Sequence, residues 1–208
     1  LDEGKMLFPK DFMIRRNWIA RVDKIMGSMP AAQLDVLNQA LAVLAVAPEK
    51  PIRHCLVHGD FVPWNIHYYP KNSQDSLYVF DWERGFTHGI PLFDACHFVV
   101  QFGILVQGWN PDKVLDQLEL LWRSETCRDY LKTAEVEDDH LPLLVTVYFL
   151  EMLLDGMEIG EYPENSAIQK KRLLCLESLL GMLRRRGYGR GSRYPRFGSI
   201  SRAPSALS

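Results

Sequence analysis

The sequence predicts a mainly α-helical protein that carries one small β-hairpin. Three observations support this fold class. Apolar residues recur at steps of three and four over most of the chain, two short β-rich runs lie close together between residues 54 and 85, and no internal repeat divides the sequence. The chain has 208 residues, of which 47% are hydrophobic and 24% are charged, which suits one domain or lobe with a substantial core.

Residues 1–50 are predicted to form a helical segment. Apolar side chains follow a helical spacing over residues 12–29, and a second apolar stripe runs over residues 34–44. Pro30 suits the first turn of the second helix, and Pro48 ends it because proline cannot continue a helix interior.

Residues 54–85 have a different character. HCLVHGD is typical of a short buried strand that enters a loop, and the β-rich runs NIHYY and SLYVF are separated by the turn-forming cluster PKNSQD. The pattern predicts a hairpin with a loop at each end. Asp60 and Asn65 precede its first strand, and Asp81 directly follows its second.

Residues 90–186 are predicted to be a helical subdomain. LFDACHFVVQFGILV is apolar on nearly all sides and predicts a central helix, and Asn110 can cap the helix that follows. A further helix is expected to start at residue 138 or 139 and to run to 157, and the last helix covers residues 167–185.

The charge is unevenly distributed. The net charge is −2, yet residues 184–208 hold seven arginines and no acid, so the rest of the chain carries 17 basic and 26 acidic side chains. Residues 187–208 are predicted to be a disordered, Arg-rich tail. A solvated extension is the simplest interpretation, and contact with nucleic acid or another acidic surface stays open.

The four cysteines are far apart and form no CxxC pair, so a zinc site is not expected. Reduced, mostly buried thiols in a reducing compartment, the cytoplasm, are the default interpretation. No apolar run reaches the ~18 residues that a membrane span requires, so no membrane partner is expected.

Asp60, Asn65 and Asp81 are expected to converge, because the start and the end of a hairpin are neighbours in space. Magnesium prefers oxygen ligands, and one or two carboxylates with substrate phosphates and water usually hold it. Asn65 and Asp81 offer such oxygens, while Asp60 is placed to receive the proton of an attacking hydroxyl. The residues therefore predict a site for phosphoryl transfer.

The segments HGDFVPWN, FDWE and GIPLFD resemble the aminoglycoside phosphotransferase and choline kinase-like family, which shares the protein-kinase fold and phosphorylates small molecules. The resemblance implies that residues 1–186 are the C-terminal lobe of a protein-kinase-like (α+β) fold that uses ATP and Mg2+. It also implies that Asp60 is the catalytic base and that Asn65 and Asp81 are the magnesium ligands. Gly59 stands where protein kinases usually carry arginine, which favours a small-molecule acceptor.

Neighbouring residues have weaker signals. His58 is expected to organise the loop rather than act as a base, and Asp94 to cap a helix or tie down the same loop by hydrogen bonds. Glu83 can approach the metal or a cationic substrate, or form a salt bridge with an arginine (Arg84 or Arg53). Trp82 is interpreted as a packing residue that would also suit a cationic substrate.

Two groups of polar residues are interpreted as ordinary. One comprises four histidines without metal-ligand spacing: His67, His88, His97 and His140. The other comprises acids at near-helical spacing, which are expected to form a solvated helix face or, alternatively, to border an acceptor pocket: Glu151, Asp155, Glu158 and Glu161.

No glycine-rich loop or strand-borne lysine of the kind that holds ATP phosphates is found before His58. The chain starts with Leu1, so an N-terminal lobe is expected upstream, and the 208 residues alone are expected to be inactive. The acceptor is not identified; an aminoglycoside, choline or a sugar fits equally.

Two other functions are compatible with parts of the sequence. One is a catalytically silent, kinase-like binding or regulatory module that uses the Arg-rich tail. The other is a metal-dependent phosphate hydrolase built on His58, Asp60 and Asp81, which is disfavoured because such enzymes gather more ligands.

Overall fold

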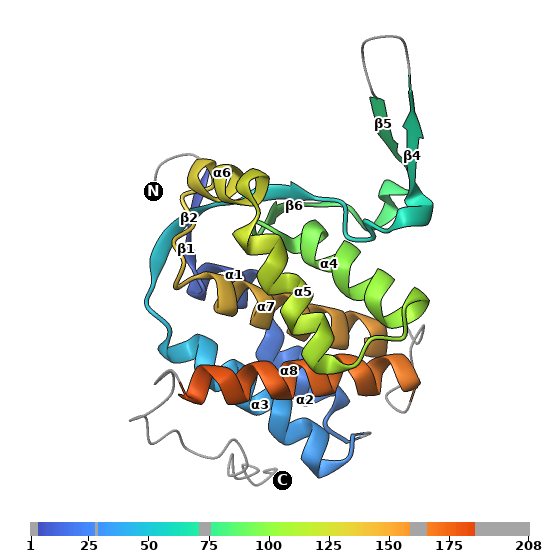
Figure 1. The fold of residues 1–208 in the computed structure, drawn as a ribbon. Coiled ribbons are helices and arrows are strands. Elements are labelled where there is room, and N and C mark those ends of the chain that lie inside the picture. The colour runs from blue at the N-terminus through green and yellow to red at the C-terminus, as the bar shows by residue number, and fades with distance from the viewer. Residues whose placement is uncertain (1–3, 28, 71–75, 159–165, 186–208) are drawn as a thin grey trace, which may run out of the picture.

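The computed structural model describes residues 4–27, 29–70, 76–158 and 166–185, so the tail predicted at residues 187–208 lies outside the described residues. The described part is mainly helical, with small pairs of antiparallel strands at one side (Figure 1). The α-helices, in chain order, are α1 (Lys10–Arg16), α2 (Trp18–Ile25), α3 (Ala31–Val46), α4 (Phe93–Gln101), α5 (Pro111–Arg123), α6 (Glu125–Thr133), α7 (Leu141–Glu158) and α8 (Ala167–Arg185).

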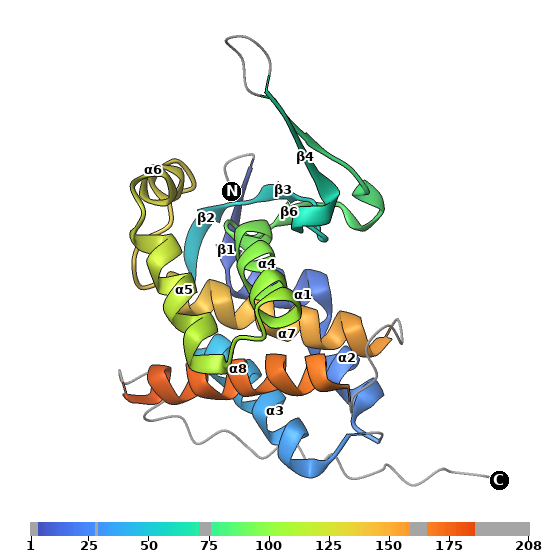
Figure 2. The same ribbon diagram turned by 45° about the vertical axis from the view of Figure 1, so that its right-hand side comes forward.

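Three antiparallel strand pairs accompany the helices in the described part of the chain. The first pairs β1 (Lys5–Phe8) with β2 (Lys50–Arg53), the second pairs β3 (Cys55–Val57) with β6 (Phe86–Gly89), and the third pairs β4 (Ile66–Tyr69) with β5 (Ser76–Val79). The β4–β5 hairpin projects away from the helical body (Figure 2).

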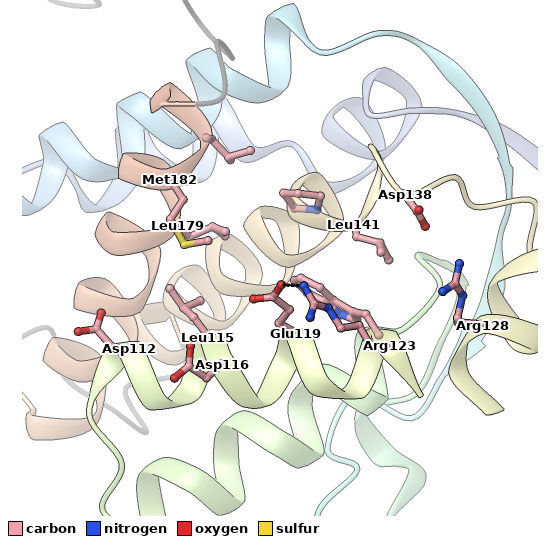
Figure 3. Close-up of a pocket in the computed structure, with 13 residues that line it drawn as sticks. Asp112, Leu115, Asp116, Glu119, Arg123, Arg128, Asp138, Leu141, Leu179 and Met182 are labelled. Atoms are coloured by element: carbon pink, nitrogen blue, oxygen red, sulfur yellow. Dashed lines mark hydrogen bonds and ion pairs between the residues drawn. The ribbon is translucent and has the colours of Figure 1, made fainter. Parts of the chain in front are cut away.

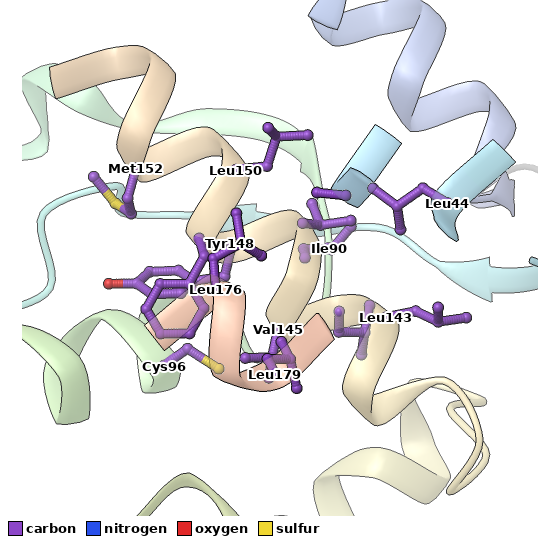
Figure 4. Packing of buried hydrophobic residues seen from close by; sticks show 14 of the residues in the cluster. Leu44, Ile90, Cys96, Leu143, Val145, Tyr148, Leu150, Met152, Leu176 and Leu179 are labelled. Carbon is purple, nitrogen blue, oxygen red and sulfur yellow. The ribbon is translucent and has the colours of Figure 1, made fainter. Parts of the chain in front are cut away.

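Helix α7 forms the centre of the core. Fifteen of its 18 residues are buried, because apolar residues occupy most of its surface and it packs against α8, α4, α3 and α2. Tyr148 of α7 lies beside Leu176 of α8 and Cys96 of α4 in the packed interior (Figure 4). This core supports the face on which β3, β6 and α4 meet.

The N-terminal segment differs from the all-helical prediction for residues 1–50. Residues 5–8 form strand β1, which pairs with β2 some 45 residues later in a register that joins Lys5 to Arg53. The apolar stripe predicted as one helix is split into α1 and α2, because Asn17 adopts a left-handed conformation with φ of 48°. Asparagine tolerates that conformation better than most residues.

The later helices follow the prediction closely, with two differences. Asn110 accepts a hydrogen bond from the backbone of Lys113 and caps α5 as expected, and α8 has the predicted bounds. The predicted central helix, however, changes to a π-helical turn at Phe102–Val106, and helix α6 was not predicted. The single predicted hairpin is one of three strand pairs. The pairings of β1 with β2 and of β3 with β6 were not expected, because each joins segments that lie far apart in the chain.

All four cysteines are free thiols, and all except Cys55 are buried, as expected. Among the described residues, no helix is long and apolar enough to cross a membrane.

Candidate active site

The loop between β3 and β4 is held at its start by a carboxylate from a distant helix. Asp94, the second residue of α4, accepts hydrogen bonds from the backbone N–H groups of His58 (2.8 Å) and Gly59 (3.0 Å). The two bonds use one oxygen each, so they fix the orientation of the loop as well as its position. Of the two alternatives for Asp94, helix capping and tying down the loop, the contacts support the second.

His58 is buried, and both nitrogens of its ring are engaged. The backbone N–H of Asp60 donates to Nδ1 (3.2 Å), so Nδ1 carries no hydrogen, and Nε2 therefore donates to the carbonyl oxygen of Phe80 (2.6 Å). The ring has no lone pair left for a substrate proton. It links the loop to the residue that follows β5.

Gly59 is required by the backbone of this loop. Its φ is +81°, and a Cβ at this position would lie 2.5 Å from the carbonyl oxygen of Arg84. Any other residue would therefore be strained in this backbone conformation, and its Cβ would clash with a backbone atom. The close approach brings the first loop against the η2 turn (Trp82–Arg84) at the other end of the hairpin.

The carboxylate of Asp60 receives one hydrogen bond on each oxygen. His97 Nε2 lies 3.3 Å from Oδ1, and Asn65 Nδ2 donates to Oδ2 at 3.0 Å. The hydrogen bond from His97 is the largest cause that lowers the pKa of Asp60 below its usual range, and burial opposes it. Asp60 is partly exposed, so an ionised carboxylate of fixed orientation faces solvent at this point.

His97, which was interpreted from the sequence as an ordinary histidine, is the second donor to Asp60. Its side chain is fully buried on α4, and burial is the main reason that its pKa is lowered. The ring is therefore neutral near pH 7, and the contact with Asp60 is a hydrogen bond from a neutral donor rather than an ion pair. Since Nε2 carries the hydrogen, Nδ1 accepts from the hydroxyl of Tyr148 (3.4 Å) and contacts the sulfur of Met152 (3.1 Å).

Asn65 and Asp81 are brought to the same place by the hairpin. The backbone N–H of Phe80 donates to the carbonyl oxygen of Asn65 (2.9 Å), and Asp81 is the next residue. Asn65 is buried, and its amide nitrogen also donates to the backbone oxygen of Asp60 (3.0 Å), which leaves Oδ1 as its candidate ligand atom. Asp81 is exposed and left-handed, with φ of 64°.

These two residues fit a magnesium ion by the chemistry of their donors. An amide oxygen and a carboxylate are the hard oxygen ligands that Mg2+ takes together with phosphates and water. No group of three or more His, Cys, Asp or Glu side chains suitable for a metal occurs among the described residues.

The residues after Asp81 are exposed. Trp82 donates its indole N–H to the carbonyl oxygen of Val79 (2.9 Å), and its ring lies 4.6 Å from the ring of His58. Nearly half of the Trp82 side chain stays accessible, so it packs on the loop and also presents a face to solvent. Arg53, one of the two arginines considered for Glu83, instead pairs with Glu135 (3.0 Å).

The acids of α7 do not form a solvated face, which corrects the sequence interpretation. Glu151 is fully buried and accepts hydrogen bonds from Arg16 (2.6 Å), Arg21 (3.0 Å) and the indole of Trp18. The arginines come from α1 and α2, so their approach could not be read from the spacing on α7. A buried carboxylate needs such partners because burial without them is very costly.

Two further acids of α7 belong to the same ion-pair network. Arg21 contacts both Asp155 and Glu158, the latter at 3.1 Å. Burial is the first cause that raises the pKa of Asp155, and Glu151 adds to it. Glu161, the fourth acid of the predicted face, lies outside the described residues. The arginines thus compensate the negative charge that the sequence suggested for an acceptor pocket.

Comparison with known proteins connects this geometry to one family. The model of the phosphotransferase enzyme family (APH) matches residues 10–136. The chain belongs to this family. The matched range holds Asp60, Asn65, Asp81 and Asp94, and it ends before α7 and α8. No curated protein and no solved structure gives a significant match.

Proposed function

We propose that this chain forms the catalytic part of an ATP-dependent phosphotransferase that transfers the γ-phosphoryl group to a hydroxyl of a small molecule. Membership of the phosphotransferase family supports the reaction type. The assignment of residues rests on one observation. Two hydrogen-bond donors orient the carboxylate of Asp60, which lies in a loop beside Asn65 and Asp81.

Asp60 acts as the base in this proposal. One oxygen is bonded to His97 and the other to Asn65, so each keeps a lone pair for the acceptor hydroxyl. The lowered pKa of Asp60 keeps it ionised and makes it a weak base. That suits phosphoryl transfer, in which the transition state is loose and positioning of the hydroxyl contributes more than early proton removal.

Asn65 Oδ1 and the carboxylate of Asp81 would hold Mg2+. The ion would neutralise negative charge on the phosphates of ATP during transfer. Asn65 then has two tasks, since its amide nitrogen orients Asp60 while its oxygen faces the metal. Two exposed residues follow Asp81 in the chain, Trp82 and Glu83. They would contact a substrate, and Glu83 would alternatively contact the metal.

The acceptor would not be recognised by the acids of α7. Glu151 is buried and paired with two arginines, and Arg21 also engages Asp155 and Glu158. An aminoglycoside-, choline- or sugar-like acceptor would have to use groups nearer Asp60, of which Trp82 and Glu83 are the exposed ones. A cation would fit these two residues through ring and carboxylate contacts.

An N-terminal lobe is the proposed partner, and the protein-kinase-like fold is the proposed architecture of the whole. The β4–β5 hairpin and its flanking turns expose large apolar side chains: Trp64, Tyr68, Tyr69, Leu77, Tyr78, Phe80 and Trp82. A two-stranded hairpin is only marginally stable by itself, and an exposed apolar patch of this kind usually marks a contact surface. A lobe that covers this hairpin would also supply contacts to the α- and β-phosphates of ATP.

Thermal unfolding with ATP tests the proposal on the chain as it is. We expect the unfolding temperature to rise with millimolar ATP only when Mg2+ is present, and this rise to be lost in Asp81→Asn. Asp116→Asn, an exposed acid on α5, is the matched control that should keep the response. An absent response in the parent chain would favour the alternative, a catalytically silent kinase-like binding or regulatory module.

A further inference from the structure

A groove separate from the candidate active site lies between α5, α8 and the start of α7, and we call it the α5–α8 groove. It encloses a cavity of about 480 Å3. Its floor is apolar and is made by Leu115, Leu141, Leu179 and Met182 (Figure 3). Leu183, two residues before the end of α8, also lines it.

The rim of the α5–α8 groove is acidic. Asp112 and Asp116 stand on α5 towards one end of the groove, and Asp138 lies towards the other end, in the segment before α7 (Figure 3). All three are exposed, and no hydrogen bond or ion pair joins them to other residues in the described part of the chain. Glu119 is different, because it pairs with Arg123 at 2.5 Å. Arg128 on the rim offsets one of the three charges, so the groove keeps a negative balance.

One polar atom in the groove wall is unsatisfied. The indole nitrogen of Trp122 is buried and has no hydrogen-bond partner among the described residues. The atom is covered by the groove wall itself, so an occupant would reach it only after the Trp122 side chain turns.

The chain itself contains a segment with the complementary chemistry. Residues 186–208 hold five arginines and no acid, together with Tyr188, Tyr194, Phe197 and Ile200. This segment leaves α8 at Arg185, next to the groove. Its 23 residues can extend over about 75 Å, whereas α8 is only about 28 Å long, so it can return along the groove without strain.

We propose that residues 186–208 dock into the α5–α8 groove of the same molecule. Arginines of the tail pair with Asp112, Asp116 and Asp138, and aromatic side chains cover the apolar floor. The docked tail is thus an intramolecular ligand of α5 and α8, and this proposal is independent of the phosphotransferase activity.

Limited trypsin digestion of the full chain tests the proposal, since each tail arginine is a cleavage site and docking hides it. The groove variant carries Asp112→Asn, Asp116→Asn and Asp138→Asn, which remove charge and keep shape. The control variant carries Asp23→Asn, Asp35→Asn and Asp129→Asn, three exposed acids elsewhere with the same total charge change. Intact-mass spectrometry follows the loss of the tail.

We expect the groove variant to lose its tail at least about tenfold faster than the parent chain, because cleavage tracks the undocked population. High salt should accelerate cleavage of the parent chain, and the control variant should match the parent. Equal cleavage rates in the parent and the groove variant would overturn the proposal. Protection that disappears on dilution would also overturn it, because the groove would then hold the tail of a second copy.

Discussion

The imidazole of His97 lies 3.3 Å from the carboxylate of Asp60, although the two residues are 37 positions apart. His97 comes from the middle of α4, a buried helix, and Asp60 comes from the loop after β3. His97 holds Oδ1 of Asp60 from the buried helix α4, and Asn65 holds Oδ2 from within the loop. The candidate base is therefore oriented by the helical core as well as by its own loop.

Removal of the His97 donor should raise the pKa of Asp60. In His97→Leu the main cause of the lowered pKa disappears while the burial of Asp60 remains, so the pKa should move upward. Tyr148→Phe, which removes the hydroxyl that contacts the imidazole but keeps the ring, should give a smaller rise. Carboxylate chemical shifts in an NMR pH titration would measure both. An unchanged pKa of Asp60 in His97→Leu would contradict the assigned contact.

The stability of the chain should fall as the pH drops through the range in which histidines protonate. The pKa of His97 is lowered in the folded state by burial, so the unfolded chain binds a proton there at a higher pH than the folded chain does. Stability is then fully present above the ordinary histidine pKa of 6.5 and declines below it. Burial lowers the pKa of His54 and His140 too, and these residues add to the same decline. Urea unfolding at pH 7 and pH 5 should show a smaller loss in His97→Gln than in the parent chain.

Gly59→Ala should unfold the loop or the domain. The new Cβ would lie 2.5 Å from a backbone oxygen, and φ is +81°, so the expected cost exceeds about 3 kcal/mol. Gly108→Ala is the matched control, because φ is +64° there and no atom lies within 4 Å of the added Cβ. It should cost only about 1 to 2 kcal/mol, the price of the left-handed conformation by itself. Chemical denaturation of the two variants would separate the clash from the conformational strain, and equal costs would show that the approach to Arg84 is not tight.

Glu151→Gln should be strongly destabilising. The substitution leaves Arg16 and Arg21 beside a neutral amide in a buried position, which costs about 3–5 kcal/mol for a buried pair that loses one partner. Glu158→Gln is the control on the same network, and it should cost below about 1 kcal/mol because its side chain is 26% exposed. The difference between the two unfolding free energies is the measurement. A cost for Glu151→Gln as small as that of the control would argue against a buried network.

The 208-residue chain alone should transfer phosphate to no acceptor above the background rate. Its sequence before His58 holds no glycine-rich loop, and the two strand lysines there, Lys5 of β1 and Lys50 of β2, pair with acids between residues 135 and 139. Positioning supplies most of the catalysis in this reaction. A radiolabelled ATP assay over aminoglycosides, choline and sugars would measure this. Phosphorylation that depends on Asp60 in the isolated chain would refute the expectation, whereas activity gained on addition of an N-terminal lobe would agree with it.

Local patterns were enough to predict some features of this protein. The bounds of α8, the cap at Asn110 and the β4–β5 hairpin follow from apolar periodicity and turn chemistry, which depend on residues near one another in the chain. The same holds for the grouping of Asp60, Asn65 and Asp81 around a hairpin. Such a grouping can be predicted without the tertiary fold, because short, regular elements link the residues concerned.

The sequence could not predict interactions between residues that are distant in the chain. The pairing of β1 with β2, the burial of Glu151 among Arg16, Trp18 and Arg21, and the hydrogen bond from His97 to Asp60 each join segments that carry no mutual signal. By itself, the sequence determined the helical periods, the hairpin and the candidate ligands at its two ends. Only the tertiary structure decided which acids are neutralised and which histidine orients Asp60, because burial and hydrogen bonding depend on what packs against a residue rather than on its neighbours in the chain.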